Sequence, residues 1–307
     1  MMTRLVQCVP NFSEGRRPEV VHSIVEAIRS AGPAKVVDYS WDADHNRSVV
    51  TVLGEPEAVK AAVLAGAERA VELIVMRKHK GEHPRIGAID VVPVVPVIGC
   101  TMAECVALSY EIGKEIADRL GIPVYFYERS ANMGHRANLA EIRKGGYEGL
   151  RAAGLDGDRE PDLGPHELHP TAGATVVGAR GPLIAYNVNL KTSDVSVARK
   201  IARRIRKVRD EGKALAGVKA IGINLRSRGL AQVSTNITQP HATSIYDVFR
   251  FVEEAAGKLG VEIAESELVG VVRQDAVVEA LCDAIHLPAL PESQILDNWL
   301  AGKSHQV

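Results

Sequence analysis

The chain alternates strand-like and helix-like segments, and the same order of elements occurs twice. Short apolar segments rich in β-branched residues predict strands at 5–9, 35–38, 46–53, 86–97, 123–127, 183–190, 218–225, 231–237 and 261–269. Apolar periodicity predicts helices at 18–31, 55–77, 102–120, 195–209, 243–259 and 275–284, with shorter helical pieces over 138–154. In the strand at 86–97, Pro93 and Pro96 indicate an edge strand or a bulge.

This repeated order favours a particular class of fold. Strand–helix–strand–strand–helix–strand is the order of a split β-α-β unit, in which helices cover one face of an antiparallel sheet. We therefore expect an α+β protein with two ferredoxin-like subdomains, residues 1–178 and 179–307, and helices on one face of each sheet. The halves share this order without a residue-level repeat.

Composition excludes several classes of protein. A length of 307 residues with 46% hydrophobic and 24% charged residues is typical of one large or two medium globular domains. The formal net charge of −1 gives no indication of nucleic-acid or membrane binding. The N-terminus is too polar for a signal sequence, and the longest apolar runs are too short to span a bilayer. The four cysteines contain no C-x-x-C pair, which fits a reducing cytoplasm.

The densest polar cluster, R-K-H-K-G-E-H-P-R at 77–85, lies between a predicted helix and a predicted strand. His79, Glu82 and His83 match the H-x-x-E-H pattern of zinc hydrolases, which requires a helical turn. Gly81 and Pro84 disfavour that turn, so we expect no metal site. His83 is better interpreted as a histidine in an extended turn, with a pKa suited to general acid–base catalysis. A solvated helix end remains the alternative for the lysines.

Other polar segments have structural and functional interpretations. The segment at 11–16 fits a helix-entry loop, 42–47 a hairpin turn, and 232–236 a strand with one polar face. The segment at 156–173, rich in Gly, Pro, Asp and His, predicts a long loop, and loops of this length are usually functional or disordered. The basic run from Arg199 to Arg209 fits a solvated helix face or an attraction for a polyglutamate tail.

Several stretches make the sequence resemble the glutamate formiminotransferase family, which includes the transferase part of formiminotransferase-cyclodeaminase. The longest are V-P-N-F-S-E-G at 9–15 and H-K-G-E-H-P-R-I-G-A-I-D at 79–90. Shorter ones follow in the family's order, at 46–47, 123–125, 161–162, 164–165, 173–175, 178–180, 187–190, 232–236 and 268–270. Together they extend over nearly the whole chain.

The resemblance implies an activity and a site. It implies transfer of a formimino group from N-formimino-L-glutamate to the 5-nitrogen of tetrahydrofolate, in histidine degradation and one-carbon metabolism. It implies a homodimer, a cleft between two subdomains, His83 as the catalytic residue and tetrahydrofolate as co-substrate. The implied folate loop consists of Gly164, Pro165, His166, Glu167, Leu168, His169, Pro170, Thr171, Ala172 and Gly173. We expect no fused cyclodeaminase and no channelling to one.

The substrates carry carboxylates, so cationic anchors are expected, and planar guanidinium groups bind carboxylates with two hydrogen bonds. The expected substrate-binding residues are Asn11, Arg47, Lys80, Glu82, Arg85, Arg180 and Asn187. For each cation a surface ion pair is the alternative. Two other functions stay open, namely formyl transfer from N-formylglutamate on the same site, and a non-catalytic folate-binding module.

Overall fold

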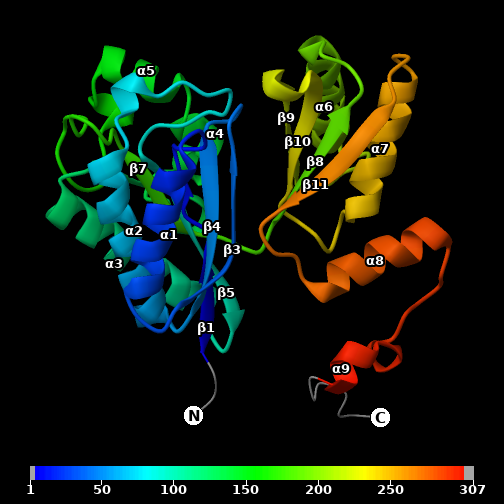
Figure 1. The fold of residues 1–307 in the computed structure, drawn as a ribbon, viewed down its shortest axis with the longest axis horizontal. Coiled ribbons are helices and arrows are strands. Elements are labelled where there is room, and N and C mark those ends of the chain that lie inside the picture. The colour runs from blue at the N-terminus through cyan, green and yellow to red at the C-terminus, as the bar shows by residue number, and fades with distance from the viewer. Residues whose placement is uncertain (1–3, 301–307) are drawn as a thin grey trace. The chain divides into compact units, whose positions relative to one another are not determined.

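The computed structural model describes residues 4–300. Its fold is α+β, with two separate sheets, as the sequence predicted. The chain divides into two compact units (Figure 1). Unit 1 contains the described residues up to Pro182 together with Ile223–Gly229 and Val269–Val271, and unit 2 contains the rest. No helix in the described part of the chain is both long and apolar enough to cross a bilayer.

The sheet of unit 1 has seven strands in the order β3–β4–β1/β2–β5–β7–β6. They are β1 (Leu5–Cys8), β2 (Asn11–Phe12), β3 (Lys35–Asp42), β4 (Arg47–Gly54), β5 (Ile89–Ile98), β6 (Val124–Phe126) and β7 (Thr175–Ala179). The expectation of an antiparallel sheet is wrong here, because β7 pairs in parallel with both β5 and β6. Helix α3 (Met102–Leu120) provides the crossover from β5 to β6 that parallel strands need. The expected boundary after residue 178 falls inside β7.

Helices cover both faces of this sheet. Helices α1 (Pro18–Ser30), α2 (Pro56–Leu73) and α3 pack against inward-facing residues such as Val50 and Val92. A second, smaller core on the opposite face joins Val91 and Val176 to Leu150 of α5 (Gly146–Ala153) and to Ile142 of α4 (Leu139–Ile142). Since successive strand residues point to opposite faces, both sides of β5 and β7 are apolar and both need cover. The prediction that helices cover only one face of the sheet is therefore wrong for unit 1.

Strand β5 is central, with β1 and β2 on one side and β7 on the other. The edge-strand interpretation of Pro93 and Pro96 is thus wrong. The bulge alternative fits, because Val6 pairs with Pro96 while Leu5 pairs with Ile98, which shifts the register by one residue. The carbonyl of Pro93 still serves the sheet by accepting from the Val9 N–H at 3.2 Å.

Unit 2 contains a four-stranded sheet in the order β11–β8–β10–β9. Its strands are β8 (Ile184–Leu190), β9 (Val218–Leu225), β10 (Leu230–Ile237) and β11 (Ile263–Val269). Helices α6 (Val195–Asp210) and α7 (Ile245–Gly257) share an apolar core with β8 and β10, and α8 (Gln274–Ile285) and α9 (Leu296–Leu300) follow. The alternate residues of these strands form a polar row in which Asn187 donates to Glu267 and Asn189 to Glu265.

Candidate active site

The segment that carries His83 runs from α2 to β5 without a regular helix. Residues 79–85 contain no helical turn, in agreement with the expected effect of Gly81 and Pro84. His79 and His83 therefore do not lie one helical turn apart, as the H-x-x-E-H motif requires. Within the described residues, no group of three or more His, Cys, Asp or Glu side chains is arranged to hold a metal ion.

His83 is half-buried, and both of its ring nitrogens lie close to Nη1 of Arg47, Nδ1 at 2.7 Å and Nε2 at 2.5 Å. Nδ1 also lies 2.8 Å from the carbonyl oxygen of Pro84, which can only accept, and this contact favours the proton on Nδ1. With that tautomer, Nη1 of Arg47, which can only donate, bonds to the lone pair of Nε2. The ring of His45 stacks on His83 with 5.8 Å between centroids. Burial, followed by the charges of Arg47 and Arg143 and by His45, lowers the pKa of His83 well below its usual value. His83 is thus a neutral imidazole with its basic nitrogen at Nε2, and the expectation that its pKa lies near neutrality is wrong for this environment.

Arg47 is positioned by the strands of the sheet. Asn11 of β2 pairs with Val49 of β4, which puts the side chains of Asn11 and Arg47 on the same face. Asn11 accepts a hydrogen bond from Nη2 of Arg47 and donates to the carbonyl of Val9 at 2.6 Å. Burial is the main cause that lowers the pKa of Arg47 to about 9, and the charge of Arg143 adds to it. The guanidinium is therefore a desolvated cation held against His83.

Asp90 and Arg143 form a buried ion pair beside these groups. Asp90 is the extra residue of a bulge, since Asn11 pairs with Val91 and Phe12 with Ile89. One carboxylate oxygen accepts from the Ile86 N–H at 2.9 Å, and the other accepts from Nη2 of Arg143. The two side chains are only 2% and 9% exposed. Sequence reasoning assigned neither residue a role, although an aspartate between Ile89 and Val91 was a signal.

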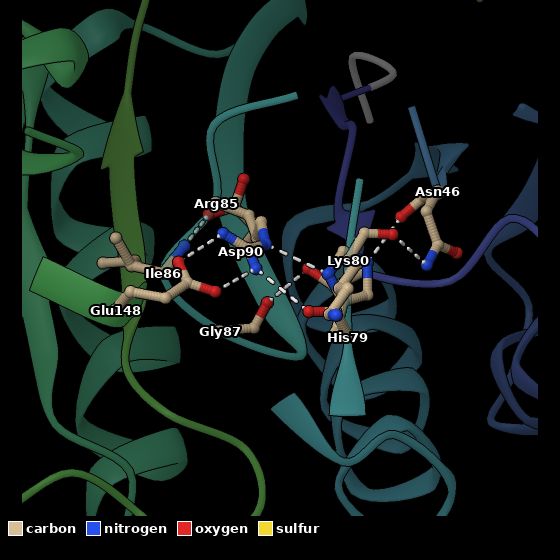
Figure 2. A network of polar contacts seen from close by, with 9 residues as sticks. Asn46, His79, Lys80, Arg85, Ile86, Gly87, Asp90 and Glu148 are labelled. Carbon is tan, nitrogen blue, oxygen red and sulfur yellow. Dashed lines mark hydrogen bonds and ion pairs between the residues drawn. The ribbon is translucent and has the colours of Figure 1, made fainter. Parts of the chain in front are cut away.

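A clamp centred on Asn46 joins the loop before Arg47 to the loop before His83 (Figure 2). Its amide oxygen accepts from the Gly15 N–H and its amide nitrogen donates to the Lys80 carbonyl, both at 2.9 Å. Its own carbonyl accepts from Nε2 of the buried His79 at 2.8 Å. Asn46 has φ of +48°, a left-handed conformation that asparagine tolerates better than most residues. The clamp fixes the relative position of the two loops.

Arg85 extends this network on the other side of His79 (Figure 2). Its Nε donates to Nδ1 of His79 at 3.0 Å, and two further nitrogens donate to Glu148 at 2.6 and 2.7 Å. Since Nδ1 accepts, Nε2 of His79 is the protonated nitrogen. Most of the hydrogen bonds that Arg85 can donate are therefore already made to groups of the protein.

The end of the segment 164–173 lies along the backbone that follows His83. Ala88 donates to the carbonyl of Ala172 at 2.8 Å, and Ala174 donates to that of Ile86 at 3.1 Å. His169 orders the turn before them, because its Nδ1 accepts from the Ala172 N–H at 3.0 Å. Residues 164–167 are exposed. The expected folate segment is thus tied at one end and open to solvent at the other.

The remaining predicted residues are more dispersed. The Lys80 side chain is exposed, and Glu82 forms an ion pair with Arg226 at 3.2 Å. Arg180 donates to the carbonyl of Gly181 at 2.9 Å and lies close to Tyr127. Asn187 belongs to unit 2. Of the predicted residues, Asn11, Arg47 and His83 are in direct contact.

Comparison with known proteins gives consistent matches along the chain. Residues 5–180 match the family model "Formiminotransferase domain, N-terminal subdomain", and residues 185–285 match "Formiminotransferase domain". A glutamate formimidoyltransferase of Streptococcus pyogenes serotype M1 is 41% identical over 302 residues, 98% of this chain and 100% of the relative. The formimidoyltransferase-cyclodeaminase of Rattus norvegicus is 41% identical over 297 residues, 95% of this chain and 55% of the relative.

Proposed function

The chain belongs to the formiminotransferase family, and on that premise we propose that it is a glutamate formimidoyltransferase. It transfers the formimino group from N-formimino-L-glutamate to the 5-nitrogen of tetrahydrofolate and releases L-glutamate, in histidine degradation and one-carbon metabolism. The observation that carries the proposal is the neutral imidazole of His83, with a basic Nε2 among buried guanidinium groups. This arrangement suits an acid–base catalyst for substrates that carry carboxylates.

The reaction needs one group that takes a proton and returns it. The 5-nitrogen of tetrahydrofolate attacks the carbon of the protonated amidine, and a carbon–nitrogen bond forms while the π pair of the C=N bond moves onto the imino nitrogen and Nε2 of His83 accepts the proton of the attacking nitrogen. In the tetrahedral intermediate, His83 returns this proton to the glutamate nitrogen. The imino nitrogen then re-forms its double bond to the carbon, and the bond from the carbon to the glutamate nitrogen breaks. The hydrogen bond from Nδ1 to Pro84 holds the ring in the tautomer that this sequence requires.

The substrate contacts follow from the same proposal. Tetrahydrofolate, as co-substrate, lies against Gly164 to Gly173, whose end is tied to the backbone after His83. Asn11 and Arg47 bind the donor beside His83. Lys80, Glu82, Arg180 and Asn187 complete the expected substrate-binding set, and Arg85 acts through His79, to which it donates.

The finer points of organisation are proposals as well. We propose two ferredoxin-like subdomains, residues 1–178 and 179–307. The antiparallel order β5–β1–β4–β3 supports such a core in the first, to which β7 and β6 are added, and the order β11–β8–β10–β9 supports it in the second. A homodimer is proposed from the family resemblance. A cytoplasmic location is proposed because all four cysteines are free thiols.

Turnover with two donors tests the function. Purified protein is mixed with tetrahydrofolate and either N-formimino-L-glutamate or N-formyl-L-glutamate, and release of L-glutamate and formation of the folate product are measured. We expect turnover of the formimino donor with a large preference over the formyl donor. Preference for the formyl donor would establish formyl transfer instead. Folate binding without turnover of either donor would indicate a non-catalytic folate-binding module.

A further inference from the structure

The half-buried cation of Arg47 and the buried ion pair of Arg143 with Asp90 lie together beside His83. The carboxylate of Asp90 is already engaged at both oxygens, by Ile86 and by Arg143. The Nε–H groups of Arg47 and Arg143 are both buried and have no acceptor among the described residues. With His83 neutral, the two guanidinium groups and the Asp90 carboxylate together carry one net positive charge.

Such an arrangement is costly unless a ligand completes it. A buried N–H without an acceptor loses its hydrogen bonds to water and gains none in return, and a buried cation without a counter-ion costs more. Burial first, and the charge of Arg143 second, lower the pKa of Arg47 to about 9, although the charge of Asp90 opposes the change. An anion placed between the two guanidinium groups would accept from their free N–H groups and neutralise the excess charge.

We propose that Arg47 and Arg143 form the subsite for the α-carboxylate of the formimino donor. The proposal rests on the proposed function and adds to it a residue, Arg143, and the identity of the group that it binds. Asp90 is the positioning residue that holds Arg143 in place.

Geometry selects the α-carboxylate among the carboxylates of the two substrates. Arg47 touches the ring of His83, and His83 must reach the nitrogen atoms bonded to the transferred carbon. The α-carboxylate carbon of the donor is three bonds from that carbon, which is at most about 4 Å. The γ-carboxylate is two bonds further away on a flexible chain. The folate carboxylates lie beyond the aminobenzoyl ring and are out of reach.

Binding at this subsite would also change the state of His83. In the structure Nη1 of Arg47 lies against both ring nitrogens of His83, and with the proton on Nδ1 it occupies the lone pair of Nε2 that must accept a proton. A carboxylate is a stronger acceptor than an imidazole, so the bound donor would draw Nη1 of Arg47 away from Nε2. The base is then free only when the donor is in place.

Matched donors test the subsite in the wild-type full chain. N-formimino-4-aminobutyrate lacks the α-carboxylate, and N-formimino-2-aminobutyrate keeps it but lacks the γ-carboxylate. We expect kcat/KM to fall by about 10²-fold for the first relative to N-formimino-L-glutamate, and by less for the second, because charge-assisted hydrogen bonds are lost only with the α-carboxylate. An equal fall for both, or a larger fall for the second, overturns the proposal.

Variants then assign the effect to Arg143. In Arg143→Gln we expect kcat/KM to fall by less than about tenfold when the α-carboxylate is removed from the donor, because one of the two arginines that bind this carboxylate is gone. Lys144→Gln, an equal change of charge at the exposed neighbour, should keep the wild-type discrimination. If Arg143→Gln does not fold, Arg143→Lys retains the charge but not the planar fork, and should show an intermediate value. Wild-type discrimination in a folded Arg143 variant overturns the assignment.

A binding measurement separates this proposal from the proposed function. Calorimetry compares L-glutamate with 4-aminobutyrate, which lacks the α-carboxylate, on wild-type protein and on Arg143→Gln. L-glutamate should bind wild type at least about tenfold more tightly than 4-aminobutyrate, and the difference should shrink in the variant. If wild type turns over no formimino donor yet shows this preference, the function fails and the subsite stands. If wild type turns over the formimino donor but binds L-glutamate no more tightly than 4-aminobutyrate, the function stands and the subsite fails.

Discussion

His83 combines a fixed tautomer with a partner that can be displaced. Its Nδ1 lies 2.8 Å from the Pro84 carbonyl, and both ring nitrogens lie close to Nη1 of Arg47, the cation that the substrate is expected to engage. Replacing His83 by alanine removes the proton carrier and leaves the neighbouring backbone in place. We expect kcat to fall by about 10²- to 10⁴-fold with little change in folate affinity. The exposed histidine His135, changed to alanine, is the control. Wild-type kcat at saturating substrates would remove His83 from the mechanism.

The pH profile should report the groups that face His83, which are Arg47, Arg143 and His45. Burial and these three groups lower the pKa of His83 well below 6.5, the ordinary pKa of histidine. The neutral form of His83 therefore persists as the pH falls through 6.5. We expect kcat/KM, which reports the free enzyme, to stay level through that pH and to decline only in more acidic solution. In Arg47→Met one neighbouring cation is lost, so the acid limb should move to higher pH. An unmoved limb would mean that Arg47 does not control His83.

Residue types alone could predict part of this site. A histidine followed by proline in a polar cluster indicated His83, and the resemblance added Asn11 and Arg47. Arg143 lies in the polar stretch E-I-R-K, which has the pattern of a solvated surface. Its burial arises only because α4 and α5 pack on the second face of the sheet, above Asp90. No local pattern encodes that placement.

At the level of elements, the helices and strands of unit 2 were predicted to within a few residues except for the short helix α9, and β7 of unit 1 was missed. Thr175, Val176 and Val177 are β-branched strand formers, but the run is short and ends at Gly178. A Cβ at Gly178 would lie 2.4 Å from the carbonyl oxygen of Tyr127, so glycine there permits close approach to the chain after β6. The partners of β7 are distant in sequence, and the two-sided sheet that it completes could not be predicted from local periodicity.

A second close approach, at Gly87, joins the segment after His83 to the end of the proposed folate segment 164–173. A Cβ there would lie 1.9 Å from the carbonyl oxygen of Ala174 and 2.7 Å from that of Ala172. Gly87→Ala should push the end of the folate segment away from the backbone after His83. We expect kcat/KM to fall by about tenfold to 10²-fold, because displacements of about 1 Å have effects of that size. A thermal melt should show a loss of stability.

Gly134→Ala is the matched control for this change, since a Cβ at Gly134 meets nothing within 4 Å. It should leave both kcat/KM and the melting temperature close to wild type. A Gly87→Ala protein as active as Gly134→Ala would show that the contact between the two segments is not needed for folate use.

At the scale of the whole molecule, unit 1 is not one continuous stretch of chain. It includes Ile223–Gly229, the turn between β9 and β10. In that turn, Ser227 donates to Asp44 through its hydroxyl at 2.6 Å, and Arg226 pairs with Glu82 at 3.2 Å. Asp44 and Glu82 are next to His45 and His83 in sequence. The second half of the sequence therefore supplies a turn that holds both histidine-bearing loops.

The first half of the chain alone should consequently be an incomplete folate binder. A fragment of residues 1–182 keeps β7 and the segment 164–173 but lacks the turn at Ile223–Gly229. Without its contacts to Asp44 and Glu82, the loops before Arg47 and His83 open more often, and ligand affinity falls with the population of the ordered form. We expect this fragment to bind tetrahydrofolate at least about tenfold more weakly than the full chain, or to stay insoluble. The full chain with Ser227→Ala and Arg226→Ala removes the same contacts without truncation, and calorimetry should show a smaller loss in the same direction. A soluble fragment and a double variant that both bind folate as tightly as wild type would show that the turn has no part in forming the site.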